Sequence, residues 1–319
     1  MTATSRIDWA GHLARACEVV TAALPVTPLV QSLGLGEHVL LKLESFQPTG
    51  SFKVRGALAA LTEVGRESAV VTASSGNHAL GVAWAAQQLG ISATLVVPVS
   101  TSSAKLASLR RFQATVIIHG EAYEHADRHA RSLATGGMRY LSATSDPDVI
   151  AGQSTVGAEL LAQLDGPFTV VCGIGGGALA AGLGMAGSHS GRMSVIGVEA
   201  AASRAMSTAI NAGHVVPVQV GETLADGLAG NLEPGVITVS LVSQHVRRIV
   251  EVTEGQIAEA IRYLAREHGL IAEGSGAAPV AAILASAVPV TGLTVAIITG
   301  RNISFETLAR VLQNRVSPR

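Results

Sequence analysis

Few residues in this chain carry a charge, and cysteines are scarce. Charged side chains make up 14% of the 319 residues, and the formal net charge is −1. Without a basic run, the chain lacks the electrostatic footprint of a nucleic-acid-binding protein, so we expect no nucleic-acid partner. Two cysteines, Cys17 and Cys172, are too few for a disulfide framework and indicate a reducing, cytoplasmic location.

The chain also lacks an apolar segment suited to a lipid bilayer. Two uncharged stretches come nearest, Phe168–Gly187 and Gly274–Gly300. A cluster of glycines interrupts the first stretch, and Pro279 and Pro289 interrupt the second. We interpret each as a buried strand joined to a buried helix, so no membrane partner is expected.

Hydrophobic residues are abundant, at 48%, and their pattern alternates between strand-like and helix-like runs. This alternation is typical of parallel sheets covered by helices on both faces. The expected strands are Val39–Leu43, Ala69–Ala73, Ala93–Val97, Thr115–Ile118, Phe168–Cys172, Met193–Val198 and Thr294–Ile298. The expected helices are Ser51–Leu61, Gly76–Leu89, Ser103–Phe112, Tyr123–Ala134, Gly176–Met185, Glu254–His268 and Ser275–Ser286.

Lysine is the scarcest of the chemically useful residues, with only Lys42, Lys53 and Lys105. Lys105 lies beside two arginines on a polar helix face, and Lys42 lies in a strand. Lys53 follows a Pro/Gly turn and begins a helix, where the helix dipole and partial burial favour the neutral amine. A neutral amine is what imine formation with a carbonyl compound requires.

Two further segments stand between a strand and a helix. Ser74-Ser-Gly-Asn-His78 can present backbone N–H groups to an anionic ligand, although an ordinary helix cap also fits this segment. Cys172-Gly-Ile-Gly-Gly-Gly-Ala178 permits close backbone approach to a phosphate. The second segment also satisfies a dinucleotide fingerprint, with Glu199 at the right distance for a ribose. An NAD-dependent oxidoreductase using Gly173–Ala178, or a non-catalytic amino-acid-binding module, therefore remains an alternative.

Taken in this order, the three segments resemble the fold-type II pyridoxal-phosphate (PLP) family, which includes threonine dehydratase, serine racemase and hydroxyaspartate dehydratase. The resemblance runs from Pro25-Val-Thr-Pro-Leu29 to Thr299-Gly-Arg-Asn302. It is most specific in Gly50-Ser-Phe-Lys53 and in the segment that ends at His78. The dinucleotide interpretation explains neither Lys53 nor Asn77, so the resemblance favours PLP as the cofactor.

The resemblance implies a fold and a domain organisation. We expect an α/β protein of two domains, similar to the tryptophan synthase β subunit, with twisted and mostly parallel sheets flanked by helices. Residues 1–47 and 147–319 would form the large PLP-binding domain, and residues 48–146 the small domain. A homodimer is the usual assembly of this family.

The resemblance also implies roles for individual residues. Lys53 would hold PLP and later take the Cα proton, Asn77 would bind the phenolic oxygen, and Thr299 would face the pyridine nitrogen. A hydroxyl there leaves the ring a weaker electron sink than a carboxylate would, which suits β-elimination. The implied cofactor-binding residues are Phe52, Lys53, Asn77, Gly175, Gly176, Gly177, Ala178 and Thr299. The implied substrate-binding residues are Ser74, Ser75, Gly76, Asn77 and His78.

The reaction implied is removal of water from a β-hydroxy amino acid, giving a 2-oxo acid and ammonia. L-Threonine is the first expectation for the substrate and L-serine the second. His78 resembles the residue found in dehydratases and racemases. Ser75 matches the serine that racemases use as a second catalytic group. Serine racemase and 3-hydroxyaspartate dehydratase therefore stay open as alternatives.

Some positions depart from the family pattern. Leu80, Thr144 and Arg301 replace residues that are common in relatives, and each can alter substrate preference. Relatives activated by a divalent cation use a glutamate, a backbone carbonyl and an aspartate. Here Glu199 and Ser203 match, but alanine stands at position 205. One charged ligand is thin for Mg²⁺ or Ca²⁺, so no metal is expected.

Overall fold

The computed structural model describes residues 7–65 and 68–313, which form two compact units. Unit 1 combines Val26–Phe46 with residues 156–313, and unit 2 combines Asp8–Pro25 with Gln47–Thr155. The division expected from the sequence assigned residues 8–25, 47 and 147–155 to the large domain, whereas the structure places all of them in unit 2. Residues 1–6 and 314–319 of the expected large domain lie outside the described residues.

Helix α1 (Trp9–Ala23) belongs to unit 2 because of the residues it buries. Ala16 and Val20 are almost inaccessible and pack in the same apolar core as Val54 and Leu58 of helix α2 (Lys53–Thr62). The Asp8 side chain accepts a hydrogen bond from the Gly11 N–H and so caps the start of α1.

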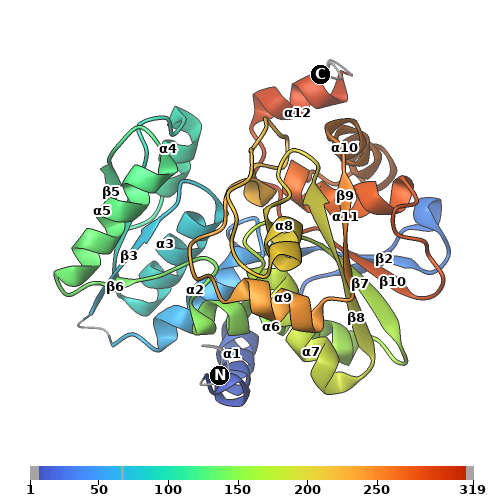
Figure 1. Cartoon of the computed structure of the whole chain (residues 1–319), viewed down its shortest axis with the longest axis horizontal. Helices are drawn as coiled ribbons and strands as arrows, with labels where there is room; N and C mark the ends of the chain where they lie inside the picture. Colours follow the sequence, from blue (N-terminus) through green and yellow to red (C-terminus); the bar gives the residue numbers. More distant parts are fainter. Residues whose placement is uncertain (1–6, 66–67, 314–319) are drawn as a thin grey trace. The chain divides into compact units, whose positions relative to one another are not determined.

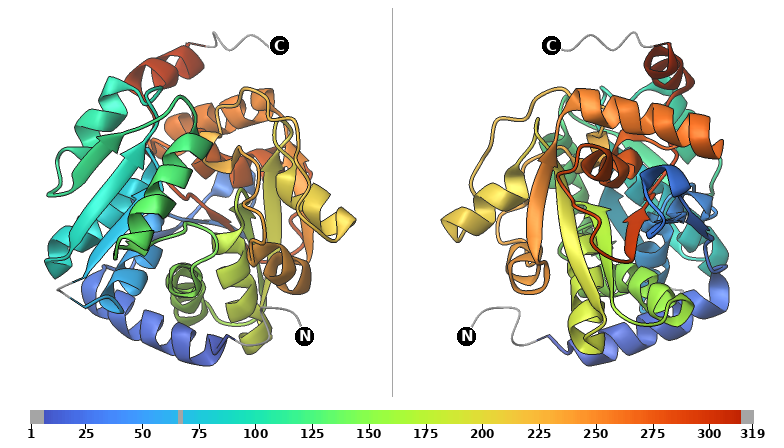
Figure 2. Two further views of the ribbon diagram at one scale, coloured as in Figure 1. Left: turned by 60° about the vertical axis from the view of Figure 1, so that its left-hand side comes forward. Right: turned by 90° about the vertical axis from the view of Figure 1, so that its right-hand side faces the viewer.

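Unit 2 is built on a four-stranded sheet in the order β5-β4-β3-β6, with every pairing parallel. Successive side chains in a strand point to opposite faces, and apolar residues follow one another in β3 and β4. Both faces of the sheet are therefore apolar, and both are covered. Val70 and Leu95 face the core that contains α2 and α3, whereas Val71 and Val96 pack against α5. Figure 2 shows the green helix α5 lying along one face of this sheet. The elements are β3 (Ala69–Ala73), α3 (Asn77–Leu89), β4 (Ser92–Val97), α4 (Ser103–Leu109), β5 (Thr115–Ile118), α5 (Tyr123–Thr135) and β6 (Arg139–Tyr140).

Unit 1 contains a six-stranded sheet in the order β1-β2-β10-β7-β8-β9, in which only β1 and β2 are antiparallel. Helices α7 and α9 lie on one face of this sheet, and α10 and α11 lie on the other (Figure 1). The strands are β1 (Leu29–Gln31), β2 (Val39–Lys42), β7 (Phe168–Gly173), β8 (Met193–Ala200), β9 (Arg248–Val252) and β10 (Thr294–Ile297). The helices are α7 (Ala178–Ser190), α8 (Ala205–Ala212), α9 (Thr238–His245), α10 (Glu254–His268), α11 (Gly274–Leu284) and α12 (Phe305–Leu312). The 3₁₀ turns are η2 (Leu33–Leu35), η3 (Glu44–Phe46) and η4 (Asp226–Leu228).

The mostly parallel sheets flanked by helices confirm the expected fold class, and every expected strand and helix is present. The two uncharged stretches form β7 with α7 and α11 with β10, as interpreted. Within residues 7–65 and 68–313, no helix is both long and apolar enough to span a bilayer. Helix α6 (Pro147–Gln163) was not expected, and it contributes residues to both units.

Candidate active site

Lys53 is the first residue of α2 and follows a tight turn in unit 2. Gly50 makes this turn possible, because its φ of 75° lies in the region that favours glycine. Lys53 is partly buried, and its Nζ lies 5.1 Å from the centroid of the Phe52 ring. The structure therefore places an amine at the positive end of a helix and beside an aromatic ring.

The segment from Ser74 to His78 joins β3 to α3 in the same unit. Ser74, Ser75 and Gly76 form the loop and Asn77 begins α3, all four being partly buried. The Gly76 N–H donates to Ser74 Oγ at 3.2 Å, which shapes the loop. Helix α3 passes very close to the start of α2, since a Cβ at Gly81 would lie only 3.0 Å from the Lys53 carbonyl oxygen. This close approach brings Lys53 and the start of α3 together.

His78 is buried in one hydrogen-bonded orientation beside Lys53. Its Nε2 lies 3.3 Å from the Leu141 carbonyl oxygen, which can only accept, so Nε2 carries the proton. Burial, and after it the positive charge of Lys53, lower the pKa of His78 to about 3, and the hydrogen bond to Leu141 offsets part of the shift. His78 is therefore neutral at physiological pH, and its buried Nδ1 has no hydrogen-bond partner among the described residues.

The glycine-rich loop lies in unit 1, between β7 and α7. Gly177, the last loop residue, has a φ of 86°, and the Thr238 hydroxyl donates to the Gly176 carbonyl at 2.7 Å. A Cβ at Gly175 would lie 2.8 Å from the Gly227 carbonyl oxygen. The loop therefore packs closely against η4 and α9, neither of which was linked to it by the sequence.

Thr299 reaches the same sheet edge as the glycine loop. Strand β10 pairs in parallel with β7, and Ala296 lies opposite Val171. Three residues further along each strand are Thr299 and Ile174, so both segments leave the sheet at its carboxyl end. Thr299 is only 4% exposed. Ligands of open α/β sheets bind at this carboxyl edge.

The sequence did not single out Ser275, although it lies among these segments. It occupies the first turn of α11 and is 4% exposed, and its Oγ has no hydrogen-bond partner among the described residues. A signal was present in the sequence, because a serine between two glycines at the start of an expected helix resembles the other loops of the site. The sequence does not indicate which residues Ser275 contacts, because Gly173 and Gly227 lie far from it along the chain.

Glu199 and Ser203, the weak metal candidates, have protein partners. Glu199 Oε1 accepts hydrogen bonds from the backbone N–H groups of Met206 at 2.8 Å and Ser207 at 3.3 Å. The Ser203 hydroxyl accepts from the Gly230 N–H. Burial raises the pKa of Glu199, and the hydrogen bonds from Ser207 and Met206 offset part of that shift. No group of three or more metal-ligating side chains occurs in the part of the chain that the structure describes.

The other departures from the family pattern lie near these loops or at the surface. Leu80 is in the first turn of α3, and Thr144 is in a turn where its N–H donates to Ser142 Oγ. Arg301 is exposed, and its guanidinium carbon lies 5.8 Å from the Phe46 ring centroid. Arg301 makes no ion pair with any described residue, and it follows Thr299 by two residues in the chain.

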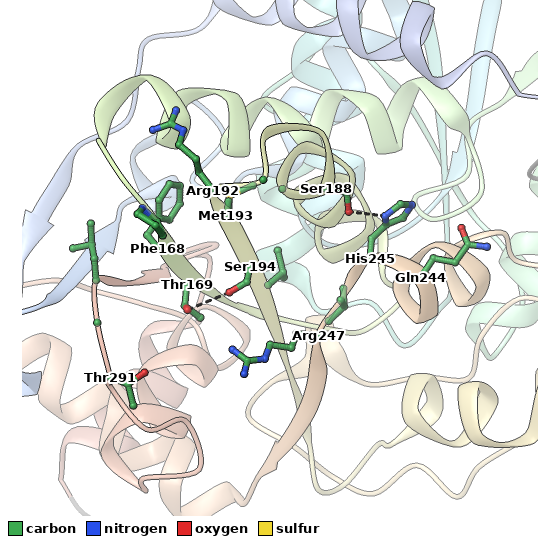
Figure 3. A pocket seen from close by; sticks show the side chains of 17 residues that line it. Phe168, Thr169, Ser188, Arg192, Met193, Ser194, Gln244, His245, Arg247 and Thr291 are labelled. Carbon is green, nitrogen blue, oxygen red and sulfur yellow. Dashed lines mark hydrogen bonds between the residues drawn. The ribbon is translucent and has the colours of Figure 1, made fainter.

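A surface pocket of about 550 Å³ in unit 1 contains none of the residues expected to act in catalysis. It lies at the amino ends of β7, β8 and β10, the opposite edge of the sheet from the glycine loop (Figure 3). Arg192 in its wall is held by the carbonyls of Leu161 and Leu164, and Thr169 Oγ1 lies 3.2 Å from Ser194 Oγ. These contacts are internal to the wall of the pocket.

The amine at a helix start in unit 2, and the glycine-rich loop and hydroxyl at the carboxyl edge of the sheet in unit 1, are groups that a PLP enzyme uses. A family model described as pyridoxal-phosphate dependent enzyme matches residues 20–300. The chain belongs to this family, and PLP is its cofactor.

The chain is also similar to proteins whose reaction is named. An L-threonine ammonia-lyase of Thermotoga maritima is 40% identical over 87% of this chain and 70% of its own length. The L-threonine dehydratase catabolic TdcB of Staphylococcus aureus is 33% identical over 98% of this chain and 94% of its own length.

Solved structures agree with the fold-type II assignment. Threonine deaminase isoform 2 of Solanum lycopersicum has a TM-score of 0.89 and 31% identity, over 96% of this chain and 93% of that one. Maize serine racemase has a TM-score of 0.87 and 25% identity, over 96% and 97% of the two chains. The expected fold-type II architecture is therefore confirmed.

The residues present fit PLP. The glycine loop approaches its neighbours so closely that a side chain at Gly175 or Gly177 would collide with them, which leaves the loop backbone bare. A lysine amine lies beside a neutral histidine whose Nδ1 is unpaired among the described residues. Bare backbone suits a phosphate, and an amine suits a carbonyl cofactor.

Proposed function

We propose that this chain is an ammonia-lyase that removes water from a β-hydroxy amino acid and releases a 2-oxo acid and ammonia. L-Threonine is the first substrate proposed and L-serine the second. The observation that carries the proposal is Lys53 at the start of α2 beside uncharged His78, in a chain 40% identical to an L-threonine ammonia-lyase.

Lys53 is proposed to bind PLP and to take the proton from the substrate Cα. Bound PLP draws electrons away from the bonds to that carbon. The positive end of α2 favours the neutral form of the Lys53 amine, which is the form that acts as a base. Phe52 is proposed to pack against the cofactor ring, because its ring already lies beside Lys53.

The remaining cofactor roles follow from the family resemblance and the local geometry. Asn77 is proposed to hydrogen-bond the phenolic oxygen, and Thr299 the pyridine nitrogen. The N–H groups of Gly175, Gly176, Gly177 and Ala178 are proposed to bind the phosphate at the start of α7. Their support is the helix N-terminus that follows the loop, where backbone N–H groups have no partner within the helix.

The loop before α3 is proposed to bind the substrate carboxylate. Ser74, Ser75, Gly76, Asn77 and His78 are the proposed substrate-binding residues. Ser75 is partly buried in this loop and carries a hydroxyl, and a structural neighbour is a serine racemase. Inversion of serine with Ser75 as the second catalytic group is therefore the second candidate function, and 3-hydroxyaspartate dehydration is a third substrate option within the same reaction.

The assembly and the location are also proposals. We propose a homodimer in the cytoplasm that acts on a small amino acid and needs no metal ion. Support for the location comes from the low cysteine count and from Cys172, which is buried and forms no disulfide. Burial raises the pKa of Cys172 to about 12, so this thiol is unreactive at neutral pH.

The test is release of 2-oxo acid by purified, PLP-loaded protein from L-threonine, L-serine, D-serine and both 3-hydroxyaspartates. We expect 2-oxobutanoate from L-threonine. Lys53→Ala should lower the turnover rate by at least about 10³-fold, because a positioned base accelerates a reaction on the order of 10²–10⁴-fold. Lys105→Ala is the matched control, since Lys105 is exposed on α4, and it should keep full activity.

Chiral analysis of the remaining amino acid separates the candidates. Inversion of serine that disappears in Ser75→Ala would favour the racemase. A protein that releases no 2-oxo acid from any of these compounds would contradict the lyase proposal, as would a Lys53→Ala variant with full turnover.

A further inference from the structure

Ser275 has a buried hydroxyl for which the described residues supply no hydrogen-bond partner. The residue is 4% exposed, and no described residue makes a hydrogen bond with its Oγ. Leaving such a group unpaired in a protein interior is unfavourable, and most buried hydroxyls have a partner. A serine retained there without one points to a partner from outside the chain.

The hydroxyl lies between the glycine loop and η4. A Cβ at Gly227 would lie 2.8 Å from Ser275 Oγ, so only a glycine permits the hydroxyl to come this close. The Gly227 carbonyl in turn touches Gly175, and the Ser275 carbonyl would lie 3.2 Å from a Cβ at Gly173. Ser275 is therefore in direct contact with the segments around the proposed phosphate loop.

The start of α11 is also joined to the segment that holds Thr299. The Glu273 N–H donates to the Gly300 carbonyl at 3.1 Å, and a Cβ at Gly276 would lie 2.6 Å from the same oxygen. Ser275 thus belongs to the same edge of unit 1 as the glycine loop and Thr299. It is also in the first turn of an 11-residue helix, where backbone N–H groups face the positive end of the dipole.

We propose that the hydroxyl of Ser275 is a ligand of the bound PLP, to which it donates a hydrogen bond. This inference rests on the proposed cofactor roles of the glycine loop and Thr299. It adds to the site a residue from α11, an element that none of the expected cofactor-binding residues occupies. The proposal also explains the glycine at position 227, because a side chain there would displace the Ser275 hydroxyl.

The test is Ser275→Ala, whose effects on the apoprotein and on PLP binding should have opposite signs. Removing an unpaired buried hydroxyl should raise the melting temperature of the apoprotein by about 1–3 °C. Losing one hydrogen bond to the cofactor should weaken PLP binding about tenfold. Both are measured on protein stripped of PLP, the first by thermal unfolding and the second by titration with PLP.

Ser194→Ala is the matched control. Ser194 Oγ has a partner, Thr169 Oγ1 at 3.2 Å, and lies at the amino edge of the same sheet (Figure 3). This variant should bind PLP as the wild type does, and its apoprotein should be no more stable than the wild type. Ser275→Cys repeats the comparison with a weaker donor of similar size if Ser275→Ala does not fold.

Each result bears on one proposal. A Ser275→Ala variant that binds PLP as tightly as the wild type, or whose apoprotein melts at a lower temperature, would overturn the role of Ser275. A wild-type protein that does not bind PLP would overturn the proposed function instead, and the two failures are told apart by the wild-type titration alone.

Discussion

At the scale of single residues, some buried polar atoms near the sequence motifs have hydrogen-bond partners and others have none among the described residues. His78 Nε2 is tied to the Leu141 carbonyl, whereas His78 Nδ1 and Ser275 Oγ have no hydrogen-bond partner among the described residues. Unpaired buried polar atoms are uncommon in folded proteins and tend to occur where function requires them. Others, such as Trp9 Nε1 and Thr101 Oγ1, lie outside the sequence motifs, whereas these two occur beside Lys53 and beside the glycine loop.

His78 should make the stability of the protein depend on pH. Its pKa is about 3 in the folded protein and 6.5 ordinarily. Between these values the unfolded chain binds a proton that the folded chain excludes. Above pH 6.5 His78 is neutral in both states and adds no pH dependence, whereas between pH 6.5 and pH 3 each unit of acidification lowers the stability of the folded protein by about 1.4 kcal/mol.

Urea unfolding of wild type and His78→Gln at pH 7, 6 and 5 measures this contribution. The glutamine keeps a side-chain N–H for the Leu141 carbonyl but does not titrate. Below pH 6.5 the free energy of unfolding of the variant should therefore fall less steeply with pH than that of the wild type, by the slope that one proton contributes. His214→Gln is the control, because His214 is exposed. If wild type and His78→Gln lose stability equally on acidification, His78 is not held neutral.

At the scale of elements, the strand–helix alternation was predictable and the contacts between elements were not. Runs of β-branched residues such as those of β3 and β5 predict strands locally, and a glycine turn before Lys53 predicts a helix start. Helix α6 was missed because the polar segment before it suggests a loop and its apolar residues follow no single face. The partners of Glu199 and Ser275 were invisible because they lie far from them in the sequence.

Helix α8 illustrates such a distant partner. Its own N-cap residue, Arg204, makes no side-chain cap. Glu199, near the end of β8, instead accepts hydrogen bonds from the N–H groups of Met206 and Ser207. A carboxylate at a helix N-terminus is stabilising both as a cap and against the dipole. The side chain that matches a cation ligand in relatives is here engaged by a helix.

Replacing Glu199 should therefore cost stability whether or not cations are present. Glu199→Ala should lower the free energy of unfolding by about 1–2 kcal/mol, and Glu199→Gln by less, because its amide oxygen still accepts. Urea unfolding with EDTA and with added Mg²⁺ measures this. Glu251→Ala is the control, since Glu251 is exposed and its ion pair is with exposed Arg204. A wild-type protein stabilised by Mg²⁺, with Glu199→Ala unresponsive, would show that the carboxylate binds a cation.

At the scale of the whole molecule, each unit has its own sheet and its own core, and each carries some of the residues that are proposed to bind PLP. Unit 2 carries Lys53, and unit 1 carries the glycine loop and Thr299. The scarcity of lysine, noted first in the sequence, has its clearest consequence here. With three lysines in 319 residues, the surroundings of all three amines can be compared.

Two of the three lysines are poor candidates for a covalent bond to PLP. Lys42 is fully buried, and its Nζ pairs with Glu159 at 2.6 Å and donates to the Thr27 carbonyl at 2.9 Å and to Gln163 Oε1 at 2.8 Å. An ammonium held by these three acceptors stays protonated, and a protonated amine does not attack a carbonyl. Lys105 is exposed on α4 and belongs to none of the segments that carry the site motifs.

Borohydride treatment of the PLP-loaded protein should therefore fix the cofactor on Lys53 alone. Peptide mapping by mass spectrometry should find one modified lysine per chain, and Lys53→Arg should yield none, because arginine stays protonated. Lys105→Arg should leave the modification of Lys53 unchanged. A modified Lys105 that persists in Lys53→Arg would mean that PLP reacts with an exposed amine without being held by the site, and modification of Lys42 would mean that its pairing with Glu159 opens in solution.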